Sequence, residues 1–348
     1  MKAKHGILYL LLAIFSSSCI REEAPNAEAD ILSCRLPGVV MTTSPIITNN
    51  SINIFVGPGT DISSLAPEFT LTPGATIDPP SGTARDFHSP QQYTVTAADG
   101  FWKKKYTVSV IDTELATIYN FEDTLGGQKY YIFVEREGEK VVMEWASGNA
   151  GYAMTGVPKT ADDYPTFQFA NGKTGKCLSL VTRSTGFFGS IMGMPIAAGN
   201  LFIGSFDVGN AMSNPLKATK FGLPFRHIPT YLAGYYKYKA GDQFTEGGNP
   251  VGGKRDICDI YAIMYETSES VPTLDGTNAF TSPNLVSIAR IDDAKETDEW
   301  TYFKLPFHML SGKYIDKEKL TAGKYNVAIV FTSSLEGDHF NGAIGSTL

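Results

Sequence analysis

The chain of 348 residues is poor in cysteine, has no excess of basic residues and contains no apolar segment long enough to cross a membrane as a helix. Its four cysteines are widely separated, so they form neither a disulfide framework nor a zinc-ligand spacing. Lys and Arg number 29 against 36 Asp and Glu, a net charge of −7. This balance argues against nucleic acid as a partner.

Signatures of several catalytic classes are also missing. The sequence has no His-Glu-x-x-His, no Gly-x-Ser-x-Gly and no phosphate-binding loop. Its acidic residues include no Glu-x-Asp-x-x-Glu strand signature of a hydrolase. The histidines are scattered, which argues against a zinc centre or a Ser-His-Asp site. The sequence therefore leaves open whether the protein is an enzyme.

The N-terminus carries the strongest local signal. Two lysines precede the short apolar run Ile7–Phe15, and three serines lead directly to Cys19. This pattern predicts a bacterial lipoprotein signal at residues 1–18, with lipid attached to the Cys19 thiol after cleavage. The alternative is an ordinary signal peptide with an incidental cysteine. With lipid on Cys19, the membrane would be a partner through the anchor.

Residues 19–33 are polar and predict a tether between the anchor and the folded part. The acidic pair Glu22–Glu23 resembles the signal that sends some lipoproteins to the outer cell surface. We therefore expect a lipid-anchored protein of the outer membrane that is exposed at the cell surface.

Residues 34–113 show short alternating runs separated by turn residues. The clearest unit is a β-hairpin in which Tyr93–Ala97 and Tyr106–Val110 flank Asp99-Gly100. This pattern predicts a small β-sandwich. The segment resembles the Ig-like modules that precede catalytic or binding domains in surface lipoproteins, and that resemblance implies the role of a spacer.

Residues 114–348 are richer in aromatic residues and contain many candidate strands, among them Leu232–Lys239, Ile257–Glu266 and Lys324–Thr332. No helical pattern alternates with these strands, so a parallel α/β fold is not expected. A larger jelly-roll β-sandwich fits best. The predicted fold class is therefore all-β, with an N-terminal Ig-like sandwich followed by a jelly roll.

Several motifs of this second region resemble the putative carbohydrate metabolism domain family, which occurs in surface lipoproteins of glycan-degrading gut anaerobes. They are Ala198–Gly204, Phe221–Phe225, Leu232–Tyr238, Asp256–Ala262 and Gly337–Ser346. The resemblance covers roughly residues 115–348. It implies a jelly roll with a role in glycan binding or processing, and it supplies a substrate class without a reaction.

Two strands carry the densest set of candidate sugar-binding residues. Sugars bind to flat aromatic faces, with carboxylates and amides on the hydroxyls. By strand alternation, Tyr236 and Tyr238 share one face of their strand, and Asp259 and Tyr261 share one face of the next. We expect these four side chains to bind a glycan. The alternative is aromatic packing between the two sheets.

Two further residues are candidate ligand contacts. Arg226 follows Gly-Leu-Pro in an expected loop and could hold a hydroxyl or a carboxylate. Its alternative role is a surface ion pair. Trp145 ends a strand before Ala-Ser-Gly-Asn and could serve as a stacking platform, or it could be a half-buried structural residue.

One acidic set could hold a structural calcium ion. Glu122 and Asp123 end the first strand of the second region, and Asp338 lies near its last strand. Calcium takes six to eight oxygen ligands from several segments. The alternative is a solvated acidic pair. No other cofactor is expected.

These patterns favour a surface-anchored lipoprotein that binds glycans, as part of carbohydrate acquisition or metabolism. One alternative is a glycoside hydrolase or lyase on the same jelly roll. The other is a structural or adhesin-type surface protein without a sugar site.

Overall fold

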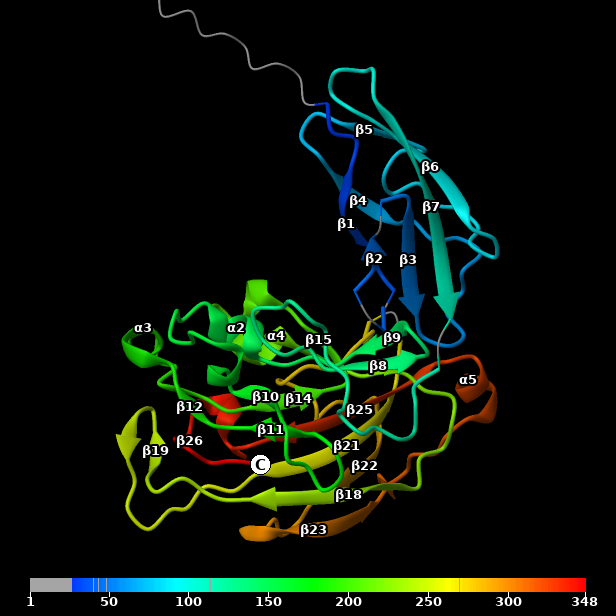
Figure 1. Ribbon diagram of the computed structural model, residues 1–348. Coiled ribbons are helices and arrows are strands. Elements are labelled where there is room, and N and C mark those ends of the chain that lie inside the picture. Colours follow the sequence, from blue (N-terminus) through cyan, green and yellow to red (C-terminus); the bar gives the residue numbers. More distant parts are fainter. Residues whose placement is uncertain (1–26, 40, 43, 48, 113, 269) are drawn as a thin grey trace, which may run out of the picture.

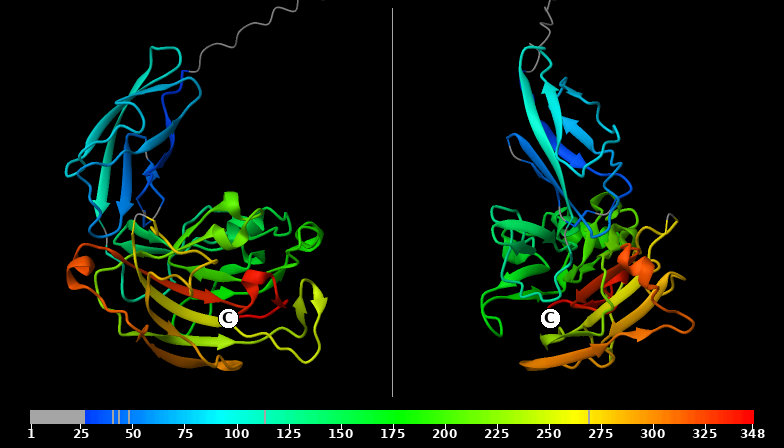
Figure 2. Two further views of the ribbon diagram at one scale, coloured as in Figure 1. Left: turned by 180° about the vertical axis from the view of Figure 1, so that it is seen from behind. Right: turned by 90° about the vertical axis from the view of Figure 1, so that its right-hand side faces the viewer.

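The computed structural model describes residues 27–39, 41–42, 44–47, 49–112, 114–268 and 270–348. Within them the chain forms two β-rich bodies joined end to end, the smaller N-terminal one standing on the larger one (Figures 1 and 2). Helices are short, and no helix of this part is long and apolar enough to cross a membrane. The predicted signal and Cys19 lie outside the described residues.

The N-terminal body is the expected Ig-like β-sandwich. Its larger sheet has the order β2-β3-β7-β6-β5 and faces the antiparallel pair β1-β4. Alternation on these strands sends Ile52, Ile54, Tyr93 and Val108 into one core. The strands are β1 (Ile31–Arg35), β2 (Ile46–Ile47), β3 (Ser51–Val56), β4 (Glu68–Leu71), β5 (Thr76–Asp78), β6 (Gln91–Thr96) and β7 (Lys103–Asp112).

The C-terminal body is built on a six-stranded sheet, as expected for a sandwich of jelly-roll type. Its path is β14-β25-β21-β22-β24, with β17 also paired to β25, and a long antiparallel ribbon of β18 and β23 continues beside it. These strands are β14 (Asn200–Phe202), β17 (Leu223–Pro224), β18 (Tyr231–Tyr238), β21 (Asp259–Glu266), β22 (Leu285–Arg290), β23 (Thr297–Pro306), β24 (His308–Met309) and β25 (Tyr325–Thr332).

Short pairs and single turns of helix close the sandwich. The pairs are β8 (Val134–Glu137) with β9 (Lys140–Glu144), β10 (Thr166–Phe169) with β11 (Cys177–Leu180), β12 (Arg183–Ser184) with β13 (Ile196–Ala197), and β15 (Gly204–Phe206) with β16 (Thr219–Phe221). A small sheet joins β19 (Phe244–Glu246) to β20 (Asn249–Pro250) and β26 (Gly342–Ala343). The α-helices are α2 (Asn149–Ala153), α3 (Gly186–Ile191), α4 (Pro215–Ala218) and α5 (Lys317–Thr321), and the 3₁₀ turns are η1 (Ala161–Asp163), η2 (Val208–Asn210) and η3 (Gly337–His339).

Strand β21 divides the C-terminal body into two sides. Asp259, Tyr261 and Ile263 point to one face, where Tyr261 and Ile263 pack in a core with Val330. Ile260, Ala262 and Met264 point to the other face. Each face carries its own hollow, so this alternation separates the two candidate sites.

Candidate functional site

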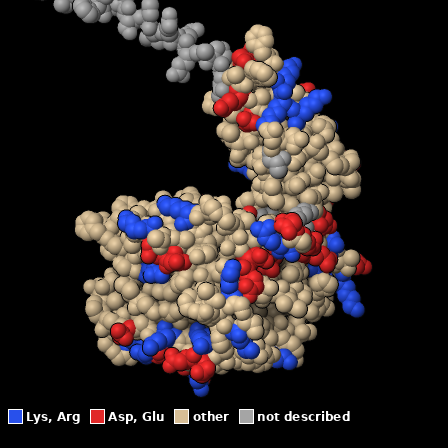
Figure 3. Space-filling model, in the orientation of Figure 1, with Lys and Arg blue, Asp and Glu red and all other residues tan. Residues whose placement is uncertain are grey.

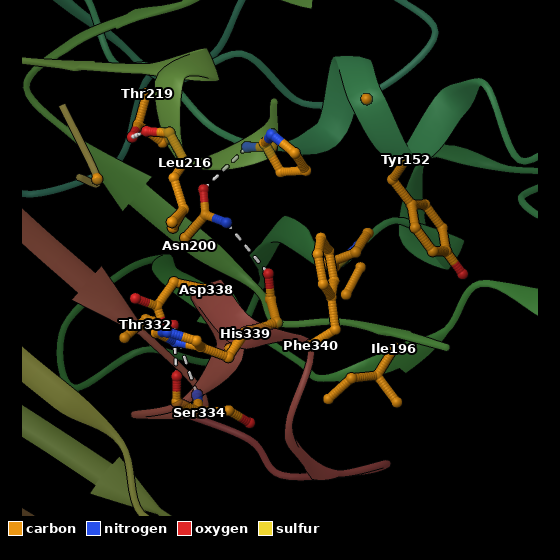
Figure 4. A pocket seen from close by; sticks show the side chains of 18 of the residues that line it. Tyr152, Ile196, Asn200, Leu216, Thr219, Thr332, Ser334, Asp338, His339 and Phe340 are labelled. Carbon is orange, nitrogen blue, oxygen red and sulfur yellow. Dashed lines mark hydrogen bonds and ion pairs between the residues drawn. The ribbon is translucent and has the colours of Figure 1, made fainter. Parts of the chain in front are cut away.

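A pocket of about 540 Å³ opens on the Asp259 face of the main sheet. Its walls come from β14, β21, α2, the α3 segment and the stretch that contains η3. Figure 4 shows Asp338, His339 and Phe340 of that stretch close to Asn200 and Thr332, with Tyr152 on the far wall. Segments distant in sequence therefore meet around one hollow.

Asp259 and Arg290 form the charged centre of this pocket. Arg290 Nε lies 3.1 Å from Asp259 Oδ1 and 3.0 Å from Oδ2, and Nη2 lies 2.6 Å from Oδ2. The Asp259 side chain is only 5% exposed, whereas that of Arg290 is 36% exposed. Burial raises the pKa of the Asp259 carboxyl, and the Arg290 guanidinium opposes this rise. Arg290 is thus the member of the pair that can reach a ligand.

Two aromatic rings surround the guanidinium. Arg290 lies 4.5 Å from the ring centroid of Phe280 and 5.7 Å from that of Tyr261. The two rings are 4.9 Å apart, and Phe280 is 40% exposed. A partly exposed aromatic ring beside a fixed cation offers a surface for the C–H face of a sugar and a donor for its hydroxyls.

The other two acids of the pocket also have basic partners. Glu336 Oε1 lies 2.7 Å from Lys254 Nζ, which holds the pKa of Glu336 below its usual range. Asp338 Oδ1 lies 2.7 Å from His339 Nδ1. The next residue, Phe340, has φ of 58°, a left-handed backbone unusual for a bulky side chain.

A buried carboxylate fixes this wall of the pocket. Asp256, 5% exposed, accepts hydrogen bonds at Oδ2 from Ser334 Oγ (2.6 Å), Ser346 Oγ (2.6 Å) and the Ala343 backbone N–H (2.7 Å). Its Oδ1 accepts from the Ile257 N–H at 2.9 Å. Because these donors flank residues 336–340 on both sides, Asp256 holds the segment that carries Asp338 to Phe340.

Asn200 fixes the opposite wall of the pocket through its side-chain hydrogen bonds. Its Oδ1 accepts from the Gly148 N–H at 2.9 Å, and its Nδ2 donates to the Ala198 carbonyl at 3.1 Å (Figure 4). A Cβ on Gly148 would lie 3.1 Å from that same Nδ2. The start of α2 is therefore held against β14 at close range.

The structure brings three of the predicted site residues together in this pocket: Asp259, Tyr261 and Asp338. Tyr236 and Tyr238 lie elsewhere, in the core under the β18–β23 ribbon, where they are 7% and 1% exposed. Their aromatic faces pack against protein, which corresponds to the alternative of packing between layers.

Trp145 and Arg226 also lie away from the pocket. Trp145 is 3% exposed, and its indole N–H donates to Glu135 at 2.9 Å. Arg226 packs against the N-terminal sandwich, since a Cβ on Gly59 would lie 2.6 Å from its Nη2. Its Nε is buried and finds no acceptor in the described part of the chain.

The predicted calcium ligands do not gather. Among the residues that the structure describes, no group of three or more His, Cys, Asp or Glu side chains could hold a metal ion. Glu122 instead accepts the Lys176 backbone N–H at 3.0 Å, and Asp338 faces the pocket beside His339.

Sequence reasoning missed Arg290, Phe280, His339 and Phe340. The Gly337–Ser346 motif contains the last two, and the sequence indicates them only through the family resemblance of that motif. Arg290 ends an ordinary alternating strand, and its partner Asp259 lies 31 residues earlier on a neighbouring strand. No pattern in the sequence near either residue predicts that they form a pair.

Comparisons with known proteins agree with this architecture. The family described as putative carbohydrate metabolism domain matches residues 120–348, and the family described as SGBP, N-terminal, matches residues 31–110. The chain belongs to the putative carbohydrate metabolism domain family. The predicted family is thereby confirmed, and a carbohydrate-related role follows at that level. No curated protein matches the chain.

Two solved structures are similar to this member of the putative carbohydrate metabolism domain family. A protein called a putative glycoside hydrolase from Bacteroides thetaiotaomicron VPI-5482 is 99% identical, covers 94% of this chain and 96% of its own, and has a TM-score of 0.76. Another, called a putative glycoside hydrolase from Bacteroides vulgatus ATCC 8482, is 49% identical, with 66% of this chain and 93% of its own covered and a TM-score of 0.62.

Proposed function

We propose that this protein is a surface-anchored lipoprotein that binds glycans in the pocket around Arg290 and Phe280. The observation that carries the proposal is the pairing of the pocket's acids. Asp259, Glu336 and Asp338 each lie against a basic side chain, and Asp259 uses both oxygens on Arg290. Glycoside hydrolysis needs two carboxylates on either side of the scissile bond. Carboxylates held in this way are better suited to orienting donors than to attack or proton transfer.

The pocket fits the end of a glycan chain or a short oligosaccharide. Its volume of about 540 Å³ lies within the usual range for small-ligand sites. Phe280 would pack against a ring face, while Arg290 and Asp338 would bind hydroxyls. Preorganisation by Asp259 and Asp256 reduces the entropy lost on binding.

The N-terminal sandwich supports the location. The SGBP family match covers residues 31–110, and its abbreviation denotes a surface glycan-binding protein. In the proposed arrangement, lipid on Cys19 anchors the chain, the residues between Cys19 and the N-terminal sandwich form a tether, and that sandwich acts as a spacer. The predicted tether of residues 19–33 is too long at its C-terminal end, because Ile31 and Ser33 pair with β4 in the sandwich. The jelly roll of residues 114–348 then presents the pocket away from the membrane.

A glycan array with the full chain, followed by calorimetric titration of the best ligand, tests this function. We expect at least one ligand whose saturable binding Arg290→Met abolishes. Arg35→Met is the matched control, because Arg35 also pairs with an acid, Glu68, but on the N-terminal sandwich. Failure of every glycan to bind, or equal loss in both variants, would contradict the proposal.

A second candidate is a glycoside hydrolase, favoured by one specific observation. Burial raises the pKa of Asp259, and the charge of Asp338 adds to that rise. A raised carboxyl pKa is what a general acid requires. Release of reducing sugar from a polysaccharide panel, lost in both Asp259→Asn and Asp338→Asn, would establish this function in place of binding alone.

A further inference from the structure

A second hollow, of about 700 Å³, lies on the opposite face of the main sheet. It runs between residues 115–121 and the outer edge of β18, and we call it the β18 groove. Ala262 of β21 and Val327, Ile329 and Phe331 of β25 form its apolar floor. Figure 1 shows β18 below β21 and β22, with its partner β23 beyond it. Nothing in the proposed pocket function uses this groove.

The charge of the β18 groove differs from that of the molecule as a whole. Lys173, Lys176 and His227 line it, and no Asp or Glu does so among its described lining residues. Outside the lining, Glu114 lies 3.7 Å from His227, and Glu122 accepts the Lys176 backbone N–H. The chain carries 36 acids against 29 Lys and Arg, and Figure 3 shows both signs intermixed on one face. A hollow with cations alone favours an anionic occupant.

Exposed aromatic rings stand along the same strand. Tyr231 is 54% exposed and Tyr235 is 48% exposed. Each ring already has a cation on it: Lys304 Nζ lies 4.0 Å from the Tyr231 centroid, and Lys173 Nζ lies 4.2 Å from the Tyr235 centroid. Such contacts are weak at exposed sites, so a ligand can draw the lysine off the ring. The freed ring face and the released ammonium group can then both contact the ligand.

We propose that the β18 groove binds an acidic glycan. Tyr231 and Tyr235 would pack against the C–H faces of its sugar rings, and Lys173 and Lys176 would pair with its carboxylate or sulfate groups. That the anion is a glycan rests on the proposed function, whereas its negative charge rests on the lining of the groove. The groove and the pocket lie on opposite faces of one sheet and have no lining residue in common, so a ligand in one does not contact the other.

Affinity electrophoresis of the full chain in gels containing a polysaccharide tests the proposal. The probes are polygalacturonate for carboxylates, chondroitin sulfate for sulfates, and dextran as a neutral polymer. We expect retardation by at least one acidic polymer and none by dextran. The double variant Lys173→Ala/Lys176→Ala should weaken that binding at least tenfold. The control Lys103→Ala/Lys105→Ala, on exposed positions of β7, should leave it unchanged.

Two further variants separate this site from the pocket. Tyr235→Ala should weaken acidic-polymer binding, while Tyr314→Ala, at a ring 73% exposed elsewhere, should not. Arg290→Met should leave groove binding intact, so a failure of the proposed pocket function alone would not contradict this inference. It is overturned if no acidic polymer retards the chain, if dextran retards the Arg290→Met variant as strongly as the acidic polymers do, or if the double lysine variant binds as the unaltered chain does. A net charge of −7 opposes non-specific attraction of these polyanions.

Discussion

The pocket and the β18 groove lie on the two faces of one sheet but differ in their polar chemistry. In the pocket, Asp259 and Tyr261 project from β21, and every lining acid has a basic partner. In the groove, Ala262 forms part of an apolar floor, and cations stand at the rim without acids in the lining. The pocket is thus built to hold donors in fixed positions, whereas no acid in the described lining of the groove pairs with its lysines. One alternating strand is enough to separate two recognition surfaces.

The largest effect should come from Asp256→Ala, which removes the acceptor of four hydrogen bonds. Buried donors left without a partner cost about 1–3 kcal/mol each, so with four donors we expect a loss of at least about 4 kcal/mol in the free energy of unfolding. The segment with Asp338 to Phe340 should lose its anchor, and pocket binding should disappear while groove binding persists. Urea denaturation and titration check this. Asp242→Ala, an acid outside both hollows, is the control, and equal effects of the two would contradict the account.

Next in size is Arg290→Met, which leaves the Asp259 carboxylate buried without its counter-charge. Breaking a buried pair is costly, but Arg290 is partly exposed, so we expect about 2 kcal/mol of destabilisation. Adding Asp259→Leu should restore most of that stability without restoring glycan binding. If the double variant is less stable than Arg290→Met alone, the unpaired Asp259 charge is not the cause of the destabilisation, and this explanation is wrong.

Phe280→Ala should mainly affect binding. The ring is 40% exposed, so its removal leaves little cavity, but a ligand loses its stacking surface. We expect about tenfold weaker pocket binding, or about 1.4 kcal/mol, with groove binding unchanged. The control is Phe101→Ala, since Phe101 is an 87% exposed ring of the N-terminal sandwich. Calorimetry compares the affinities of the two variants. Similar affinities for the two variants would remove Phe280 from the site.

The smallest effect is a pH dependence specific to the pocket. Burial raises the pKa of Asp259 above its ordinary value of 3.8, so the folded protein holds this proton more tightly than the unfolded chain. Its contribution to stability is therefore greatest below that value and is lost as the pH rises through the raised pKa. Relative to Asp259→Asn, the unaltered chain should lose stability from about pH 4 upward. The opposite slope would mean that Arg290 outweighs burial.

Alternation along single strands could be predicted from the sequence, and it holds for β21. Asp259 and Tyr261 lie opposite Ile260 and Ala262, as the period of two requires. On β18, alternation separates Tyr235 from Tyr236, but it cannot say which of the two faces the core. The packing of the ribbon against Cys258 and Ile260 decides that, and it buries Tyr236. The more exposed Tyr235 was therefore the better candidate.

The long-range pairings of the site could not be predicted. Arg290 belongs to the site because it contacts Asp259. Asp256 belongs to it because it accepts hydrogen bonds from Ser334, Ala343 and Ser346, about 80 to 90 residues later in the chain. Such contacts depend on the packing of the whole sandwich. Composition and strand patterns predict the fold class, and the resemblance of several motifs indicates the family. The site emerges only when distant segments are brought together.

A crystal structure with the best-binding oligosaccharide soaked into the pocket tests the central claim most directly. The account predicts an intact sugar with its ring against Phe280, its hydroxyls on Arg290 and Asp338, and the Asp259–Arg290 pair unbroken. A cleaved product, a glycosyl group attached to Asp259 or Asp338, or a sugar found only outside the pocket would contradict it.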